Sequence, residues 1–185
     1  MKSFYVYHVV TERPMKLGQI IKFDNNIHSG VYERVNEKKK IVEEIYNNPE
    51  KFKQEQLEHH TKVALRELAM EEVRKEFFPN YPSRLSSLYV SKNINDAIFW
   101  KNTFIKLNRK VYQLVKLKVN GREFTGNAYN CFEGTTSKEE NVKLSIKYWQ
   151  NESFEDTQPP INETLVDGYI EVVEILEEYQ DKSII

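Results

Sequence analysis

The residues best suited to chemistry in this chain stand at the ends of short strand-like segments. His8 lies in the first of these, "SFYVYHVV", Tyr89 and Ser91 belong to "SLYVS" just before a helical pattern, and Glu163 opens "ETLV". Polar and titratable groups at strand ends can face one cleft, which is a common way to build a site on a small sheet. The sequence therefore raises the hypothesis of one site assembled from distant parts of the chain.

Each of these residues also has a purely structural interpretation. His8 can hydrogen-bond inside the core, Tyr89 can be a packing aromatic, Ser91 can cap the following helix, and Glu163 can be a solvated loop residue. For each residue taken alone the structural interpretation is favoured. Only their order and combination favour a site.

Motifs of several other kinds of site are absent. There is no Walker-type phosphate loop, no Gly-x-Gly-x-x-Gly, no His-Glu-x-x-His and no Gly-x-Ser-x-Gly, and the chain has only 6 glycines. The single cysteine, Cys131, can form neither an internal disulfide nor a zinc knuckle. His59 and His60 are adjacent, so on a helix they point about 100° apart and cannot share a metal ion. No metal is expected.

Charge and hydropathy also restrict the classes of binding partner that the sequence predicts. The 185 residues include 27 basic and 28 acidic side chains, for a net charge of −1, so no whole-protein field attracts nucleic acid or a membrane. The short basic run Lys38–Lys40 in "VNEKKK" leaves RNA binding as a weak alternative, but a solvated helix face explains it better. No signal-like N-terminus or apolar run of ~18 residues is present, so a cytoplasmic protein is expected.

The elements that must position the candidate residues follow from the hydrophobic pattern. Residues 3–10 and "QIIKF" predict strands, and apolar residues at helical spacing predict helices over 35–47 and from Pro49 to about Phe77. "SLYVS" predicts a strand, and the next helix, "NINDAIFWKNTFIK", has Asn93 as its N-cap. In the helices from Pro49 and after Asn93, four residues should be largely buried: Leu65, Leu68, Trp100 and Phe104.

The C-terminal half decides the fold class. The alternation in "VYQLVKLKV" predicts a strand, residues 124–141 carry little strand signal, and "VKLSIKYW" is ambiguous, with a helix favoured. Asp167–Gly168 predicts a tight turn between the strand-like pieces "TLV" and "YIEVVEIL". Helices lie early and strands late, so we predict one α+β domain over 1–185, with a mainly antiparallel sheet and a helical insertion at about 35–78.

Taken together, these segments resemble the ADP-ribosyltransferase superfamily. The segments that carry the resemblance are "YHVV" in the first strand, "LYVSKNINDAIFW" as strand, cap and helix, and Glu163 one residue before "TLV". "PSRLSSLYVS", the downstream "YW" and "ETLVDGYIEVVEI" are similar to an uncharacterised bacterial family placed near that superfamily. The resemblance spans nearly the whole chain.

The resemblance implies NAD as the substrate and a role for each candidate residue. His8 would hold the adenosine-side ribose, Tyr89 or Ser91 would line the nicotinamide pocket, and Glu163 would stand beside the bond that breaks. Breaking the nicotinamide–ribose bond develops positive charge on the sugar, which a fixed carboxylate stabilises. Arg84 in "PSR" could bind a phosphate through two parallel hydrogen bonds, or it could simply be solvated.

The acceptor, the catalytic activity and the identity of the catalytic carboxylate remain open at the level of sequence. Many protein-modifying transferases carry a Glu or Gln two residues before the catalytic Glu, and this chain has Ile161 there. This difference argues against an arginine side chain as the acceptor of ADP-ribose. The alternative function is that of a non-catalytic descendant of the fold, a nucleotide-binding or protein-interaction module. Glu171 is the competing carboxylate, although its apolar neighbours indicate a strand interior.

Overall fold

The computed structural model describes residues 3–23, 27–152 and 160–179. In these ranges the chain forms two antiparallel sheets together with helices, which confirms the predicted α+β class. The strands are β1 Phe4–Val10, β2 Ile20–Phe23, β3 Leu88–Val90, β4 Gln113–Asn120, β5 Glu123–Asn127, β6 Asn162–Val166 and β7 Gly168–Glu178. The helices are α1 Gly30–Glu37, α2 Lys39–Asn47, α3 Pro49–Phe52, α4 His59–Phe77, α5 Ile94–Lys106 and α6 Lys138–Gln150, with a 3-10 turn at Ala128–Asn130.

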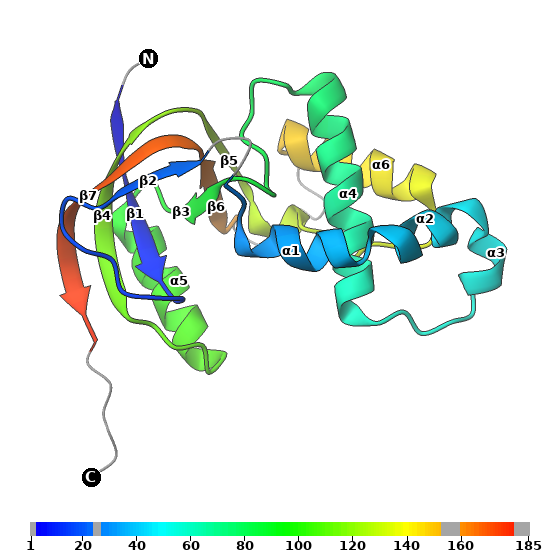
Figure 1. The fold of residues 1–185 in the computed structure, drawn as a ribbon, viewed down its shortest axis with the longest axis horizontal. Coiled ribbons are helices and arrows are strands. Elements are labelled where there is room, and N and C mark those ends of the chain that lie inside the picture. The colour runs from blue at the N-terminus through cyan, green and yellow to red at the C-terminus, as the bar shows by residue number, and fades with distance from the viewer. Residues whose placement is uncertain (1–2, 24–26, 153–159, 180–185) are drawn as a thin grey trace, which may run out of the picture.

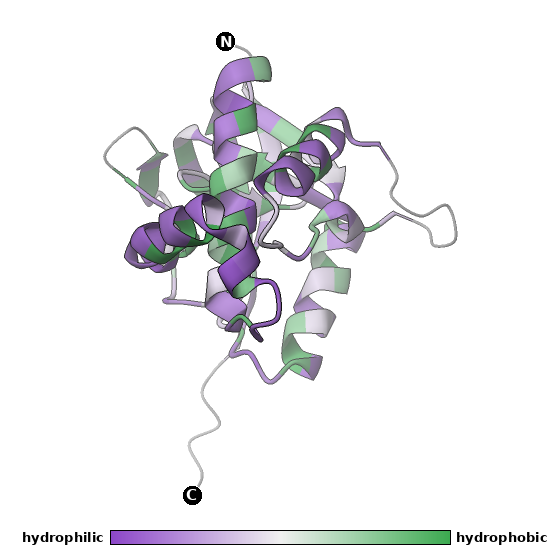
Figure 2. Cartoon of the chain, turned by 90° about the vertical axis from the view of Figure 1, so that its right-hand side faces the viewer, coloured by the Kyte–Doolittle hydropathy of each residue, from purple (hydrophilic) through white to green (hydrophobic). Residues whose placement is uncertain are grey.

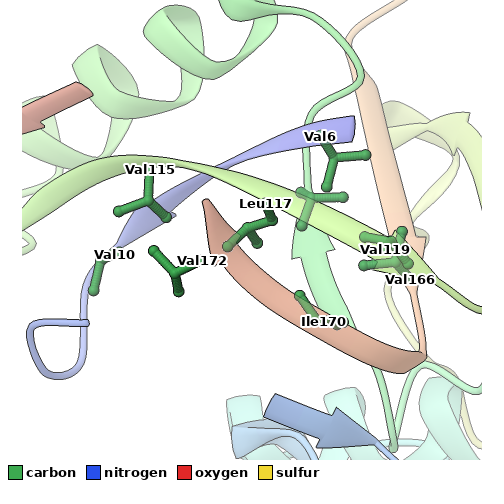
Figure 3. Close-up of a cluster of buried hydrophobic side chains, with 9 residues drawn as sticks. Val6, Val10, Val115, Leu117, Val119, Val166, Ile170 and Val172 are labelled. Carbon is green, nitrogen blue, oxygen red and sulfur yellow. The ribbon is translucent and has the colours of Figure 1, made fainter. Parts of the chain in front are cut away.

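The larger sheet has the strand order β1-β4-β7-β2 and carries the apolar core. In β4, Val115, Leu117 and Val119 are fully buried, whereas the alternating Lys116 and Lys118 are not, as a strand with one face in the core requires. Figure 3 shows these side chains gathered with those of β1 and β7. The other face of β1 packs against α5. This sheet therefore holds β1 rigidly between two apolar layers.

The smaller sheet has the order β3-β6-β5 and joins the larger sheet to the helices. In Figure 1 the sheets and α5 form one half of the molecule, and α1–α4 and α6 form the other. Side chains of α4, α6, β5 and β6 share one buried cluster that includes Trp149, Phe124 and Leu165. Viewed from the helical side in Figure 2, the helices show mixed hydrophilic and hydrophobic residues, as half-buried helices do.

Several sequence predictions need correction. The expected helix from Pro49 to Phe77 is two helices, because α3 ends at Phe52 and α4 begins at His59. Residues 124–141, expected to be loop, contain most of β5, whose Thr125 hydroxyl bonds that of Thr164 on β6. The segment "VKLSIKYW" lies in α6, as favoured. Of the four residues expected to be largely buried, Leu65 is fully buried, whereas Leu68, Trp100 and Phe104 are only half-buried.

The turn at Asp167–Gly168 does not join two paired strands. The flanking strands β6 and β7 belong to different sheets and do not pair with each other. The Asp167 carboxylate accepts hydrogen bonds from the backbone and guanidinium of Arg122, at 2.6 to 3.0 Å. Gly168 has φ +86°, and a Cβ there would stand 2.7 Å from the Asn120 carbonyl oxygen. Glycine is therefore required where the chain passes from one sheet to the other.

Candidate functional site

The candidate site lies where the edges of the two sheets meet. Tyr7 of β1 and Ser91, just after β3, exchange two backbone hydrogen bonds of 2.8 Å. One register step further, Val9 and Tyr89 would be the next antiparallel pair, but β1 is paired with β4 and β3 with β6, and Val9 and Tyr89 are not paired with each other. The two strand edges therefore separate after a single rung, and a cleft of about 540 Å³ opens beyond it. This volume is in the range of small-molecule sites.

The imidazole of His8 bridges the strands at this point. Its Nδ1 lies 2.8 Å from the Tyr89 carbonyl oxygen, which can only accept, so Nδ1 carries the proton and Nε2 is an acceptor. Burial lowers the pKa of His8 from 6.5 to about 4, although the bond to Tyr89 acts in the opposite direction. The side chain is therefore a neutral imidazole near pH 7.

The break in pairing leaves backbone groups free in the cleft wall. Tyr7 directs both of its backbone groups toward β3, and groups alternate in direction along a strand, so the N–H and C=O of Val9 point the same way. Consistently, the carbonyl of Val10 bonds back toward β4 by accepting from Tyr112. Val9 lines the cleft, and its backbone groups have no partner in the described part of the chain. A donor and an acceptor therefore stand side by side next to His8.

Four of the five candidate residues line this one cleft: His8, Tyr89, Ser91 and Glu163. Ser91 does not cap the following helix, because Asn93 fills that position, its side chain accepting a bond from the Asp96 N–H. Tyr89 packs its ring 5.3 Å from the Arg84 guanidinium. The competing carboxylate Glu171 lies inside β7, paired with the larger sheet, and does not line the cleft.

Glu163 is held through one of its two carboxylate oxygens. Its Oε1 accepts from Arg84 Nη1 at 2.6 Å and from the Tyr148 hydroxyl at 2.8 Å. No partner for Oε2 exists among the described residues. The Trp100 indole fixes the start of β6 by donating to the carbonyl of Asn162 at 2.9 Å. Glu163 thus has a fixed position and one carboxylate oxygen left for a ligand.

Arg84, the fifth candidate, lies beneath the cleft and does not line it. It is only 5% exposed. Besides Glu163, its guanidinium donates to Glu67 on α4 at 2.9 and 3.3 Å and to the Tyr148 hydroxyl at 2.5 Å. Because its guanidinium nitrogens bond these protein groups, Arg84 holds Glu163 in place and does not meet a ligand in the cleft.

A buried ionic network surrounds Arg84. Burial alone would raise the pKa of the Glu67 carboxyl, but the guanidinium groups of Arg84 and Arg66 outweigh burial and hold that pKa below its usual value. The two arginines balance Glu67 and Glu163 in charge, which a buried ionic cluster requires. Burial raises the pKa of the neighbouring Cys131 thiol, so this thiol is protonated near pH 7 and is a poor nucleophile.

Sequence reasoning missed Glu67, Tyr148 and the backbone of Val9. Glu67 is 1% exposed and lies on α4 between the buried residues Ala64 and Met70, three positions from each. An acidic residue at that spacing inside an apolar stripe was an available signal for a buried charge with a partner. The free groups of Val9 had no sequence signal, because they depend on where two strands separate.

Comparison with known proteins assigns the chain to a family. The chain matches the family described as "Protein of unknown function (DUF2441)" over residues 6–178. That range includes both sheets, apart from the first two residues of β1, and every residue of the candidate site. The chain belongs to this family. A search of the curated proteins found no match. Within the described ranges, no helix has both the length and the apolar character needed to cross a membrane.

Proposed function

We propose that the cleft binds NAD and that the protein cleaves the nicotinamide–ribose bond, transferring ADP-ribose or hydrolysing NAD. One observation carries the proposal: His8, Tyr89, Ser91 and Glu163, which resemble functional residues of ADP-ribosyltransferases, come from three separate segments and line one cleft. Such convergence of polar groups in a pocket of this size is typical of a ligand site.

The wall beside His8 suits the nicotinamide end of NAD. A primary carboxamide presents one N–H donor and one C=O acceptor side by side, and the free C=O and N–H of Val9 are complementary to both. Tyr89 lines the same cleft, and its aromatic ring would stack on the nicotinamide ring. The neutral imidazole of His8 would orient a ribose hydroxyl through the acceptor Nε2.

Glu163 would act on the bond that breaks. As nicotinamide leaves, positive charge develops on the ribose, and the carboxylate stabilises this charge more strongly in the transition state than in the bound substrate. Because Arg84 and Tyr148 hold Oε1, Oε2 can meet the sugar without a change of rotamer. Arg84 and Tyr148 are positioning residues in this proposal.

The test compares two Glu→Gln variants for nicotinamide release from NAD. We expect Glu163→Gln to lower the rate constant ~100-fold or more while leaving NAD affinity, measured by calorimetry, nearly unchanged. Glu171→Gln is the matched control, since this carboxylate does not line the cleft, and it should retain the wild-type rate. Release lost in the Glu171 variant and kept in the Glu163 variant would refute the assignment.

One observation favours a second candidate function, a protein that binds NAD without cleaving it. The Glu163 carboxylate is already paired with the Arg84 guanidinium at 2.6 Å, and this neighbouring positive charge offsets part of the charge that would stabilise an oxocarbenium ion. NAD binding by calorimetry with no nicotinamide release from the wild-type protein would decide for this candidate.

A further inference from the structure

The end of the cleft away from the Tyr7–Ser91 pair is formed by the start of α1. The Ser29 N–H donates to the Leu85 carbonyl and the Ser29 hydroxyl to the Arg84 carbonyl, both at 2.9 Å. Because its hydroxyl is used there, Ser29 makes no side-chain cap to α1. The N–H groups of Gly30 and Val31, which line the cleft, have no partner among the described residues. An uncapped helix N-terminus attracts anions.

Three arginine side chains line the same cleft: Arg13, Arg34 and Arg109. Arg34 lies one turn into α1 and donates through Nε to the Gly30 carbonyl at 3.2 Å, while Arg109 donates to the Thr11 hydroxyl at 3.2 Å. No ion pair joins any of the three to a carboxylate within the described residues. Glu12 is the acidic group at this end, and its Oε1 would lie 3.0 Å from a Cβ on Gly30.

Ser87 supplies an independent sign of a missing ligand group. It is 1% exposed and lines the cleft, and its Oγ is the buried side-chain atom without a hydrogen-bond partner in the described part of the chain. It lies two residues after Leu85, to which the start of α1 is bonded. A buried hydroxyl without a partner is costly, at roughly 1–3 kcal/mol. Its place in the cleft wall leaves this hydroxyl available to a ligand.

We propose that this end of the cleft, formed by Gly30, Val31, Arg34, Ser87 and Arg109, is a phosphate subsite that takes a diphosphate group. Free helix N–H groups, guanidinium donors and a hydroxyl are the groups that bind phosphate oxygens. The inference rests on the proposed function for the identity of the whole ligand, since the diphosphate of NAD joins its two riboses. The phosphate chemistry itself stands on the residues at this end.

The test uses inorganic pyrophosphate as the probe and calorimetry as the readout. We expect the wild-type protein to bind pyrophosphate and Arg34→Gln to weaken this binding ~10-fold. Lys40→Gln is the control, because it removes an exposed positive charge on α2. Its affinity for pyrophosphate should stay within about twofold of the wild-type value. Glu12→Gln should strengthen binding, because a carboxylate at the helix N-terminus competes with the anion. No binding to the wild-type protein, or equal losses in the arginine and lysine variants, would overturn the subsite.

Ser87→Ala gives a signature that a structural role would not produce. It removes the hydroxyl without a partner, so thermal stability should rise slightly or stay unchanged while pyrophosphate affinity falls. Lower stability with unchanged affinity would contradict the proposal.

The outcomes also separate this inference from the proposed function. Pyrophosphate binding that depends on Arg34, without NAD binding, keeps the subsite and rejects NAD as the ligand. NAD binding that is unchanged in Arg34→Gln rejects the subsite and leaves the proposed function standing.

Discussion

His8 is a neutral imidazole in the folded protein, and the free energy of unfolding therefore depends on pH. Burial lowers its pKa from 6.5 to about 4, so between these values the unfolded chain binds more protons at this residue than the folded protein does. The contribution of His8 to the free energy of unfolding is fully present above pH 6.5. It is lost as pH falls from 6.5 to about 4, by at most about 3 kcal/mol.

Urea unfolding at several pH values checks this prediction. We expect the free energy of unfolding of the wild-type protein to decline between pH 6.5 and 4, and His8→Gln to lose part of this decline. His28→Gln is the control, because His28 is exposed and its removal should leave the decline intact. Equal pH dependence in wild type and His8→Gln would show that other groups control the acid response.

Tyr148 serves Glu163 through its hydroxyl alone. This fully buried group accepts from Arg84 and donates to Glu163. We expect Tyr148→Phe to lower the free energy of unfolding by about 1.5–3 kcal/mol, the usual range for hydrogen bonds to charged groups. Tyr129→Phe removes a hydroxyl from a 51% exposed side chain and should cost almost nothing. Similar losses in both variants in urea unfolding would argue against the network.

At the scale of elements, α4 supports the cleft through the buried charge of Glu67. Glu67→Gln leaves Arg84 and Arg66 with too little negative charge around them, so we expect a loss of about 3–5 kcal/mol in the free energy of unfolding. Glu72→Gln on the same helix is the matched control, because Glu72 pairs with Lys138 at half-exposed positions and should contribute about 1 kcal/mol or less. Thermal and urea unfolding of both variants measure the loss in the free energy of unfolding. A loss in Glu67→Gln no larger than that in Glu72→Gln would contradict the prediction.

Elements with a strong local signal could be predicted from the sequence. The α5 helix has Asn93 as a cap and an apolar stripe, and the two patterns agree. The β5 strand could not be predicted, because its partners on β6 satisfy a polar sequence that carries no alternation of its own. The break between α3 and α4 was missed since the apolar spacing continues across it, and neither proline nor glycine marks the end of α3.

In the candidate site, too, some residues could be predicted from the sequence and others could not. His8 and Glu163 could be proposed because strand ends are visible in the pattern. The support beneath them could not, because Arg84 meets partners 17, 64 and 79 residues away in the sequence. Nothing local distinguishes such an arginine from a solvated loop residue, and only the packing of α4 and α6 against β6 buries it.

For the whole molecule, the shared cluster of α4, α6, β5 and β6 predicts cooperative unfolding. Trp149 lies in that cluster, and Trp100 lies on α5 against the larger sheet. Trp100→Phe and Trp149→Phe therefore each leave a fluorescent reporter in a different half. We expect the fluorescence and far-UV circular dichroism midpoints in urea to coincide within each variant. Midpoints that separate would show that the helical half unfolds by itself.

The single rung between Tyr7 and Ser91 has a consequence for association between molecules. Exposed strand edges recruit strands from other chains when several consecutive backbone groups are free. Here the row of free groups is short, because Ser91 pairs with Tyr7 on one side of Val9 and the His8 imidazole occupies the Tyr89 carbonyl opposite. Both edges also face each other across the cleft. The gap beside Val9 is thus too short and too enclosed to accept a strand from another chain, so these two facing edges offer no site for edge-to-edge association.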